Sequence, residues 1–196
     1  MPFKECLILA AGMSTRMGNW KMMLPWGEGT VLDSAMTDAL SFCDRIILVT
    51  GFRGAELHQR YHSNPDIILV HNDRYQEGMF SSVQAGVKHI KGEHFFLALG
   101  DMPVPGSAVY PALWQQRSAE CLIPVFEHGK GHPVLLPSTI VNKILNARPD
   151  DNLKTIINRY GSRTLSLQEN GILWDVDTPQ QYLQLLSRYK SLPERA

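Results

Sequence analysis

Short apolar runs alternate along this chain with segments of helical periodicity. The apolar runs predict strands at Cys6 to Ala11, Arg45 to Thr50, Ile67 to His71, Phe95 to Leu99, Cys121 to Val125 and Leu173 to Val176. Apolar residues at three- and four-residue spacing predict helices at Leu32 to Leu40, Ala55 to Tyr61, Ser82 to Ile90, Ser107 to Arg117, Ile140 to Leu145 and Gln180 to Tyr189. Strands that alternate with helices are typical of βαβ units. The pattern therefore predicts a three-layer α/β fold with a mostly parallel sheet.

The first apolar run, Cys6 to Ala11, contains no polar residue, which predicts a central parallel strand buried on both faces. The loop after it should lie at the carboxyl edge of the sheet, where open α/β sheets bind ligands. Gly12 and Gly18 let the backbone approach a ligand, and Arg16 and Lys21 add positive charge. These residues predict a polyphosphate site, although an ordinary β-to-α turn would have the same composition. Their spacing fits neither a Walker loop nor a dinucleotide-binding G-x-G-x-x-G.

Composition and charge exclude several classes of protein. The chain has 196 residues, of which 44% are hydrophobic and 19% charged, so we expect one globular domain spanning residues 1–196. Nineteen basic residues balance nineteen acidic ones, which argues against a nucleic-acid-binding protein. No apolar run approaches the ~20 residues that cross a bilayer, and the N-terminus resembles no signal peptide. Cys6, Cys43 and Cys121 are expected as buried free thiols, and a cytoplasmic protein is the prediction.

Two aspartate-containing segments are candidates for ligand chemistry. The strand at Phe95 to Leu99 is followed by Gly-Asp-Met-Pro, which places Asp101 at the carboxyl edge. Asp175 and Asp177 would point to the same face of the last predicted strand, ahead of Thr178 as a helix N-cap. Such carboxylates suit Mg²⁺ beside a triphosphate. The alternative is that they stabilise helix N-termini.

Two further segments have features of loops near a site. The segment from His71 to Ser82 joins a strand to a helix whose N-terminus carries two serines, one of which capping explains. Gly78 and this helix N-terminus could form a small polar cradle for a ligand. The stretch from Pro124 to Pro137 is rich in glycine, proline and histidine, and is expected as a flap over the site. Its two histidines lack the neighbours of a zinc site; Gly131, His132 and Pro133 alone indicate a rigid turn.

The string LAAGMSTRMGNWK, from Leu9 to Lys21, resembles the signature L-A-A/G-G-x-S-x-R-M-G-x-x-K of molybdenum-cofactor guanylyl- and cytidylyltransferases, which are MobA-like NTP transferases. The similarity continues through Met23 to Gly27, Asn72 to Gly86, Gly100 to Pro103, Gly131 to Leu135 and Asp175 to Pro179. It covers nearly the whole chain. The Ala-Ala-Gly form and the GHPVL segment are most similar to the cytidylyltransferases and to the accessory proteins of molybdenum hydroxylases.

The resemblance implies a Rossmann-like nucleotidyltransferase that moves CMP from CTP to a phosphate-bearing, pterin-type acceptor, with Mg²⁺ as cofactor and pyrophosphate as product. It implies catalytic roles for Arg16, Lys21 and Asp101, and metal binding by Asp101 and Asp177. The nucleotide-binding residues it implies are Leu9, Ala10, Ala11, Gly12, Arg16, Lys21, Asn72, Gly78 and Ser82. The acceptor-binding residues it implies are Gly131, His132 and Pro133. Family members with a second glycine at the position of Ala11 are typically guanylyltransferases, so Ala11 favours CTP.

The chain departs from the family at Arg148 to Lys154, where many cytidylyltransferases have G-D-x-G-A-R. The resemblance therefore covers the donor half of the site more fully than the acceptor half. Two alternatives follow. One is a non-catalytic maturation factor that delivers cofactor to an apo molybdenum hydroxylase, which the intact metal carboxylates argue against. The other is a sugar-phosphate nucleotidyltransferase, which usually has a longer chain.

Overall fold

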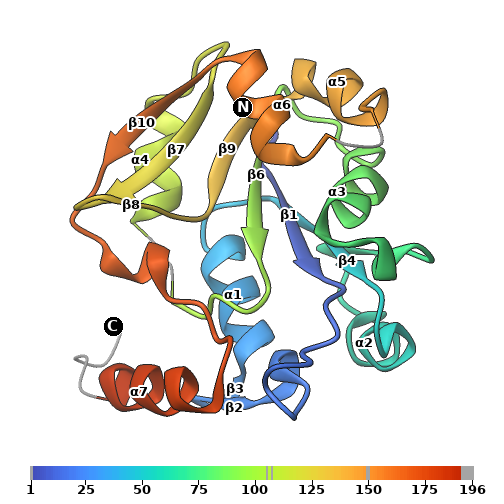
Figure 1. The fold of residues 1–196 in the computed structure, drawn as a ribbon, viewed down its shortest axis with the longest axis vertical. Coiled ribbons are helices and arrows are strands. Elements are labelled where there is room, and N and C mark those ends of the chain that lie inside the picture. Colours follow the sequence, from blue (N-terminus) through green and yellow to red (C-terminus); the bar gives the residue numbers. More distant parts are fainter. Residues whose placement is uncertain (1, 105, 107, 149–150, 191–196) are drawn as a thin grey trace.

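A mostly parallel sheet runs through the centre of the computed structural model, which describes residues 2–104, 106, 108–148 and 151–190 (Figure 1). Its strand order is β10-β7-β9-β6-β1-β4-β5, and β8 pairs with β7. The strands are β1 (Glu5–Ala10), β4 (Arg45–Thr50), β5 (Ile67–His71), β6 (His94–Leu99), β7 (Cys121–Phe126), β8 (Gly129–Lys130), β9 (Val134–Pro137) and β10 (Ser162–Ser166). A separate hairpin consists of β2 (Pro25–Trp26) and β3 (Gly29–Thr30).

Most of the helices cover the two faces of this sheet, and the last helix lies beside the hairpin (Figure 1). They are α1 (Val31–Leu40), α2 (Gly54–Tyr61), α3 (Met79–Val87), α4 (Val109–Gln115), α5 (Val141–Leu145), α6 (Leu153–Tyr160) and α7 (Pro179–Lys190). Short 3-10 helices lie at η1 (Lys21–Met23), η2 (Tyr75–Glu77), η3 (Ser138–Ile140) and η4 (Asn170–Leu173). The expected mixed α/β class with a mostly parallel sheet is confirmed.

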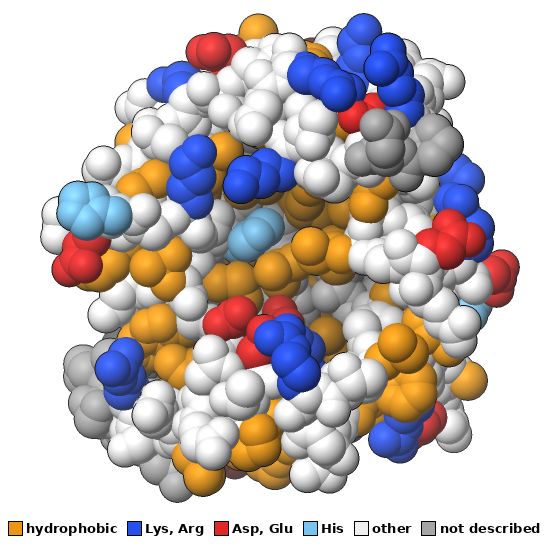
Figure 2. All heavy atoms as spheres, in the orientation of Figure 1, with side chains coloured by type: hydrophobic (Ala, Val, Ile, Leu, Met, Phe, Trp, Pro, Cys, Tyr) orange, Lys and Arg blue, Asp and Glu red, His pale blue; other side chains and the backbone are white. Residues whose placement is uncertain are grey.

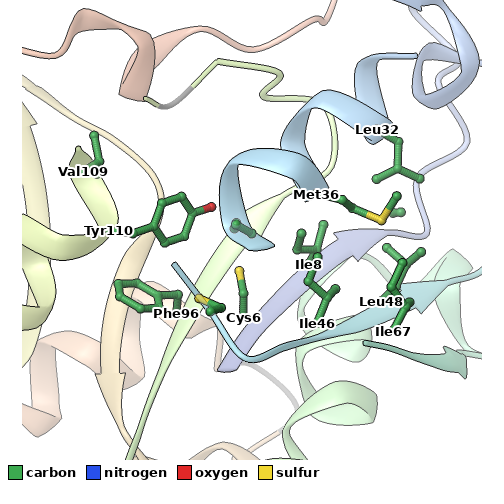
Figure 3. Close-up of a cluster of buried hydrophobic side chains, with 14 of the residues drawn as sticks. Cys6, Ile8, Leu32, Met36, Ile46, Leu48, Ile67, Phe96, Val109 and Tyr110 are labelled. Atoms are coloured by element: carbon green, nitrogen blue, oxygen red, sulfur yellow. The ribbon is translucent and has the colours of Figure 1, made fainter. Parts of the chain in front are cut away.

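The side chains of β1 alternate between two cores, one on each face of the sheet. Cys6 and Ile8 pack in a cluster with Leu32 of α1, and Figure 3 shows Cys6 and Ile8 on the side of the sheet that faces this helix. Leu7 and Leu9 pack in the other cluster with residues of α3. All six residues of β1 are buried, as the apolar run that begins at Cys6 predicts for a central strand, and Glu5 at its start is buried with its carboxylate bonded to Arg45. The three layers follow from this two-sided burial.

The central strands end together at one edge of the sheet. β1 pairs in parallel with β4 and with β6, so that Ala10 lies opposite Thr50 and Leu9 opposite Leu99. β4 in turn pairs in parallel with β5. The loops after β6, β1, β4 and β5 therefore emerge side by side, which is where ligands bind in such sheets.

The segment from Pro124 to Pro137 is not a flap, which corrects the sequence-based expectation. Its last residues form β9, which runs antiparallel between β6 and β7 and is buried along its whole length. A flap must be exposed, whereas Val134 to Pro137 contributes apolar side chains to the sheet.

The strand predicted at Leu173 to Val176 is also wrong. Leu173 ends the 3-10 helix η4, and the residues after it are an extended connection to α7. The buried side chains of Ile172 and Val176 produce the alternation, without a neighbouring strand to pair with. Thr178 nevertheless caps α7 as predicted, because its hydroxyl accepts the N–H of Gln181 at 3.2 Å.

Other predicted elements match to within a few residues. The helix expected from Ser82 to Ile90 begins three residues earlier, at Met79, so Ser82 lies inside the helix. Strand β10 and helix α6 were not predicted at all. Ser107, expected to begin a helix, and Pro149 and Asp150 of the divergent segment lie outside the described residues.

The cysteines and the helices agree with the expectations from composition. Cys6, Cys43 and Cys121 are buried free thiols. In the part of the chain that the structure describes, no helix is both long and apolar enough to cross a membrane.

Candidate active site

A cavity of about 310 Å³ lies at the carboxyl edge of β6, β1 and β5. The residues that line it are Leu9, Ala11, Gly12, Met13, Lys21, Met22, Tyr75, Gln76, Gly78, Met79, Ser82, Leu99 and Asp101. Figure 2 shows a hollow in this face, with hydrophobic side chains along its floor and acidic and basic side chains together at its edge. The predicted site residues Leu9, Ala11, Gly12, Lys21, Gly78, Ser82 and Asp101 thus share one cavity.

The loop after β1 is folded around Ser14. This residue has a left-handed backbone (φ 56°), its carbonyl accepts the N–H of Met17 at 3.0 Å, and its hydroxyl accepts the N–H of Lys21 at 3.2 Å. Gly18 also has a positive φ, of 69°, which favours glycine. These contacts turn the chain back so that Lys21, the first residue of η1, faces the cavity. No described atom lies within 4 Å of the place where a Cβ on Gly12 would be, so the backbone there is open to a ligand.

Lys21 joins the two aspartates that the resemblance implied as metal ligands. Its Nζ donates to Asp101 Oδ2 and, at 2.9 Å, to Asp177 Oδ1. Arg16 Nη2 lies 2.6 Å from Asp177 Oδ2, with 72% of its side chain exposed. The side chains of Lys21, Asp101 and Asp177 are only 12%, 14% and 20% exposed. The fold thus brings together four charged groups from three distant parts of the sequence.

A backbone hydrogen bond holds the two aspartate segments together. The N–H of Val176 donates to the carbonyl of Asp101 at 3.0 Å. This bond fixes the extended connection before α7 against the turn that follows β6. The position of Asp177 therefore depends on the turn at Asp101 and not on a strand of its own.

The charges of this cluster shift the pKa values of its members. Burial alone would lower the pKa of Lys21, but Asp101 and Asp177 outweigh it and the pKa is raised above 10.5. Burial alone would raise the pKa of Asp177, but Lys21 and Arg16 outweigh it and hold this pKa below 3.8. Asp175 behaves in the opposite way, because burial and the negative charges of Asp177 and Asp101 raise its pKa. Lys21 is thus held cationic and Asp177 anionic near neutral pH.

The donor set has the chemistry of a site for a divalent metal. Two carboxylates converge on one cationic atom, the Nζ of Lys21, as they would on a metal ion. Carboxylate oxygens are ligands that Mg²⁺ prefers, and Mg²⁺ usually takes its remaining ligands from water and phosphate. Among the described residues, no cluster of three or more His, Cys, Asp or Glu side chains is arranged to hold a metal. Asp101 and Asp177 therefore fit a metal that a phosphate-bearing ligand helps to bind.

Asn72 supports the cavity from behind and does not line it. It is 4% exposed, and its Nδ2 donates to Ser81 Oγ at 2.8 Å and to Ser82 Oγ at 3.0 Å. Gly78 precedes α3 with φ 103°, a conformation that other residues rarely adopt, and no side chain caps this helix. The start of α3 therefore borders the cavity, which Gly78, Met79 and Ser82 line.

The predicted acceptor residues divide into packing residues and one polar side chain. A Cβ on Gly131 would lie 2.3 Å from the carbonyl of Ile172, and Pro133 is buried, so both serve packing. The His132 ring lies with Nδ1 3.3 Å from the carbonyl of Leu97. Part of its surface reaches solvent, yet burial lowers its pKa, partly opposed by the Leu97 carbonyl and by Asp101. Of these three residues, His132 is the one with a titratable side chain, and the charge of Asp101 acts on its pKa.

Ala10, Arg16 and six cavity residues complete the comparison with the sequence. Ala10 packs in the core, and Arg16 reaches the site through Asp177. The cavity residues that were not among the predicted site residues are Met13, Met22, Tyr75, Gln76, Met79 and Leu99. Met13 fills a variable position of the signature, so the signature carried no signal for it.

Comparisons with known proteins identify the family of this chain. Residues 6–164 match the family described as the MobA-like NTP transferase domain. The chain belongs to this family. It is 37% identical over 188 residues to the molybdenum cofactor cytidylyltransferase of Escherichia coli, which covers 96% of this chain and 98% of the relative. This MobA-like chain is accordingly a nucleotidyltransferase.

Solved structures show the same fold. A homologue of the Mycobacterium tuberculosis protein Rv0371c, from Mycobacterium sp. strain JC1, has a TM-score of 0.81 at 26% identity, with 97% of this chain and 98% of the other covered. The molybdopterin-guanine dinucleotide biosynthesis protein A of Archaeoglobus fulgidus has a TM-score of 0.76 at 15% identity, with 96% and 100% covered. Both similarities extend over almost the entire chain.

Proposed function

We propose that this MobA-like protein transfers CMP from CTP to the phosphate group of a molybdopterin-type acceptor and releases pyrophosphate. The 37% identity to a molybdenum cofactor cytidylyltransferase supports the acceptor class and the nucleotide. Ala11, which lines the cavity, supports CTP over GTP by the resemblance described above.

The reaction is a substitution at the α-phosphorus. An oxygen of the acceptor phosphate attacks this phosphorus, and the bond from it to the oxygen bridging to the β-phosphorus breaks. The bonding electrons leave with pyrophosphate, and a diphosphate linkage joins the acceptor to CMP. A phosphate monoester has a second pKa of ~6 and is largely ionised near neutral pH, so no strong general base is needed.

The residues of the cavity supply alignment and charge. Lys21 and Arg16 offset the negative charge that grows on the leaving pyrophosphate, as electrostatic catalysis requires. The open backbone at Gly12 lets N–H groups approach the phosphates. Asp101 and Asp177 would hold Mg²⁺, which when bound neutralises phosphate charge and orients the reacting oxygens. Asn72 positions Ser82 and the start of α3 around the nucleoside.

The convergence of Lys21, Asp101 and Asp177 at one end of a cavity is the observation that carries this proposal. The test is to incubate the purified protein with Mg²⁺, molybdopterin and each of CTP and GTP, and to measure pyrophosphate. CTP should give rapid release, and Asp101→Asn should reduce it by at least about 100-fold, as loss of one electrostatic group does elsewhere. Unchanged turnover in Asp101→Asn would overturn the role of this carboxylate. Absence of pyrophosphate with either nucleotide would overturn the proposed reaction.

A further inference from the structure

Two exposed methionines stand at the nucleotide cavity. Few large hydrophobic side chains are exposed among the described residues, and Met13 (45%) and Met79 (62%) are two of them. Both line the cavity that contains Lys21 and Asp101. They come from different elements, since Met13 follows β1 and Met79 is the first residue of α3. Exposed apolar side chains that gather in a concave site commonly mark a contact with a ligand.

The sheet order determines which part of a nucleotide these side chains can reach. The order β6-β1-β4-β5 places Asp101, after β6, on one side of the cavity and Met79, after β5, on the other. The loop with Met13 lies between them because it follows β1. Phosphates beside Lys21 and Asp101 would leave the rest of the nucleotide to extend toward β5. The part that extends there is the nucleoside, whose base has two flat apolar faces.

We infer that Met13 and Met79, together the methionine clamp, contact the faces of the nucleobase when a nucleoside triphosphate binds. The inference rests on the proposed function, because it takes the phosphate end from the charged cluster. A thioether on an unbranched side chain adapts its shape to a flat ring, and contacts of sulfur with aromatic rings are favourable. Both side chains would also lose apolar surface to the ligand. The clamp discriminates little among bases, since every base has such faces.

Other residues at this end of the cavity suit the polar edge of a base. Gln76 brings an amide to the same region, where the first turn of α3 has no side-chain cap. In a small-molecule site, apolar side chains commonly contact the faces of a ligand ring, and a few polar groups hydrogen-bond to its edge. The clamp therefore supplies affinity, and the polar groups supply the choice of base.

Methyl spectra of the clamp test this inference without turnover. The eight methionines are labelled with ¹³C at the methyl group, and Met13→Leu and Met79→Leu variants assign the two signals. CTP with Mg²⁺ should shift both signals through the ring current of the base, whereas tripolyphosphate with Mg²⁺ should not. The buried Met36 is an internal control. Equal shifts with both ligands, or no shift while the ³¹P signals of CTP report binding, would overturn the clamp.

Kinetics provide a second readout. Met13→Ser and Met79→Ser should each raise the KM for CTP by about 2- to 10-fold, and should change kcat much less, because the contact holds the base and not the reacting atoms. Leucine at either position should restore most of the affinity. Leu183→Ser, which alters a leucine 63% exposed on α7, is the matched control and should leave the KM unchanged.

The outcomes separate the clamp from the proposed function. Shifts with CTP in a protein that makes no dinucleotide product would retain the clamp and reject the reaction. Normal turnover would retain the reaction. If the methionine signals then shift equally with CTP and tripolyphosphate, and the serine variants keep the wild-type KM for CTP, the clamp is rejected. A surface that serves a protein partner instead would give this second result.

Discussion

Replacing Lys21 by methionine should destabilise the protein and make it depend on magnesium. Methionine keeps an unbranched apolar side chain of similar length but removes the ammonium group. Asp101 and Asp177 would then lie at 14% and 20% exposure without the ammonium group between them, and only the exposed Arg16 would still pair with Asp177. Burial and the charges of Asp177 and Asp101 already raise the pKa of Asp175, and the variant would also lose the opposing effect of Lys21 on this pKa. The variant therefore has a cation site without its cation.

The magnitude follows from the burial of the pair. Removing one partner of a fully buried ion pair costs about 3–5 kcal/mol, and an exposed pair contributes at most about 1 kcal/mol. The Lys21 cluster lies between these limits, so we expect a loss of about 1–3 kcal/mol in the free energy of unfolding. For a chain of this size, each kcal/mol lowers Tm by roughly 2–4 °C. Mg²⁺ at ten times its Kd would return about 1.4 kcal/mol to the variant.

The assay is thermal unfolding followed by circular dichroism, with and without Mg²⁺, at neutral pH. The wild-type Tm should respond less to Mg²⁺, because the metal must compete with the Lys21 ammonium. Arg74→Met is the matched control, since Arg74 forms an exposed ion pair with Glu77 and should matter by less than about 1 kcal/mol. A Lys21→Met variant as stable as the wild type, or equal Mg²⁺ shifts in both proteins, would refute this reasoning.

Three further predictions concern the residues around the cavity. Gly12→Ala should leave Tm unchanged but raise the KM for CTP, whereas Gly78→Ala should lower the free energy of unfolding by about 1–3 kcal/mol, because its φ of 103° strains any other residue. Thermal unfolding and nucleotide titration distinguish these two effects, and the opposite pattern would contradict the assignment. Asn72→Ala removes the donor to two buried serine hydroxyls, so urea unfolding should show a free energy of unfolding lower by about 1–3 kcal/mol, and the affinity for CTP should be weaker. Wild-type stability in this variant would show that the hydrogen bonds of the Asn72 amide contribute nothing. The pKa of His132 lies below 6.5 in the folded protein, so its contribution to stability is complete above pH 6.5 and is lost as pH falls through the lowered pKa. His132→Gln should therefore flatten the dependence of stability on pH in this range. An unchanged slope would show that the His132 ring does not cause it.

Much of the central fold could be predicted because its strands carry strong patterns. β1, β4 and β5 each have at least four consecutive apolar residues, and their bounds differ from the predictions by at most one residue. The errors come from weaker patterns. β9 is only four residues long and ends in a proline, so it looked like part of a loop. β10 lies at the sheet edge with no fully buried residue, so it lacks the apolar alternation that identifies a strand.

The opposite error, a predicted strand that does not exist, arose at Leu173 to Val176, where buried side chains alternate but the backbone pairs with no strand. Ile172 and Val176 are fully buried, and their spacing imitates the alternation of a strand. The segment is held instead by single contacts, such as the bond from the N–H of Val176 to the carbonyl of Asp101. Periodicity reports which side chains are buried, and it does not report whether the backbone has a neighbouring strand.

The sequence predicts the charged residues of the site, but it does not predict the contacts between them. The signature placed Lys21 in the phosphate loop, and the strand ends placed Asp101 at the same edge. The contact of Lys21 with Asp177 joins residues 156 positions apart and depends on the path of the chain before α7. Met79 was missed for a different reason, because the predicted helix began three residues too late.

The most direct test of the proposed reaction is to follow the α-phosphorus of the donor. The protein is incubated with Mg²⁺, molybdopterin and CTP labelled with ³²P at the α-position, and the products are separated by chromatography. We predict that the label moves to the pterin product in a new diphosphate linkage, with one pyrophosphate released for each label transferred. Label that stays in CTP, or appears as free CMP without a pterin adduct, would contradict nucleotidyl transfer to this acceptor.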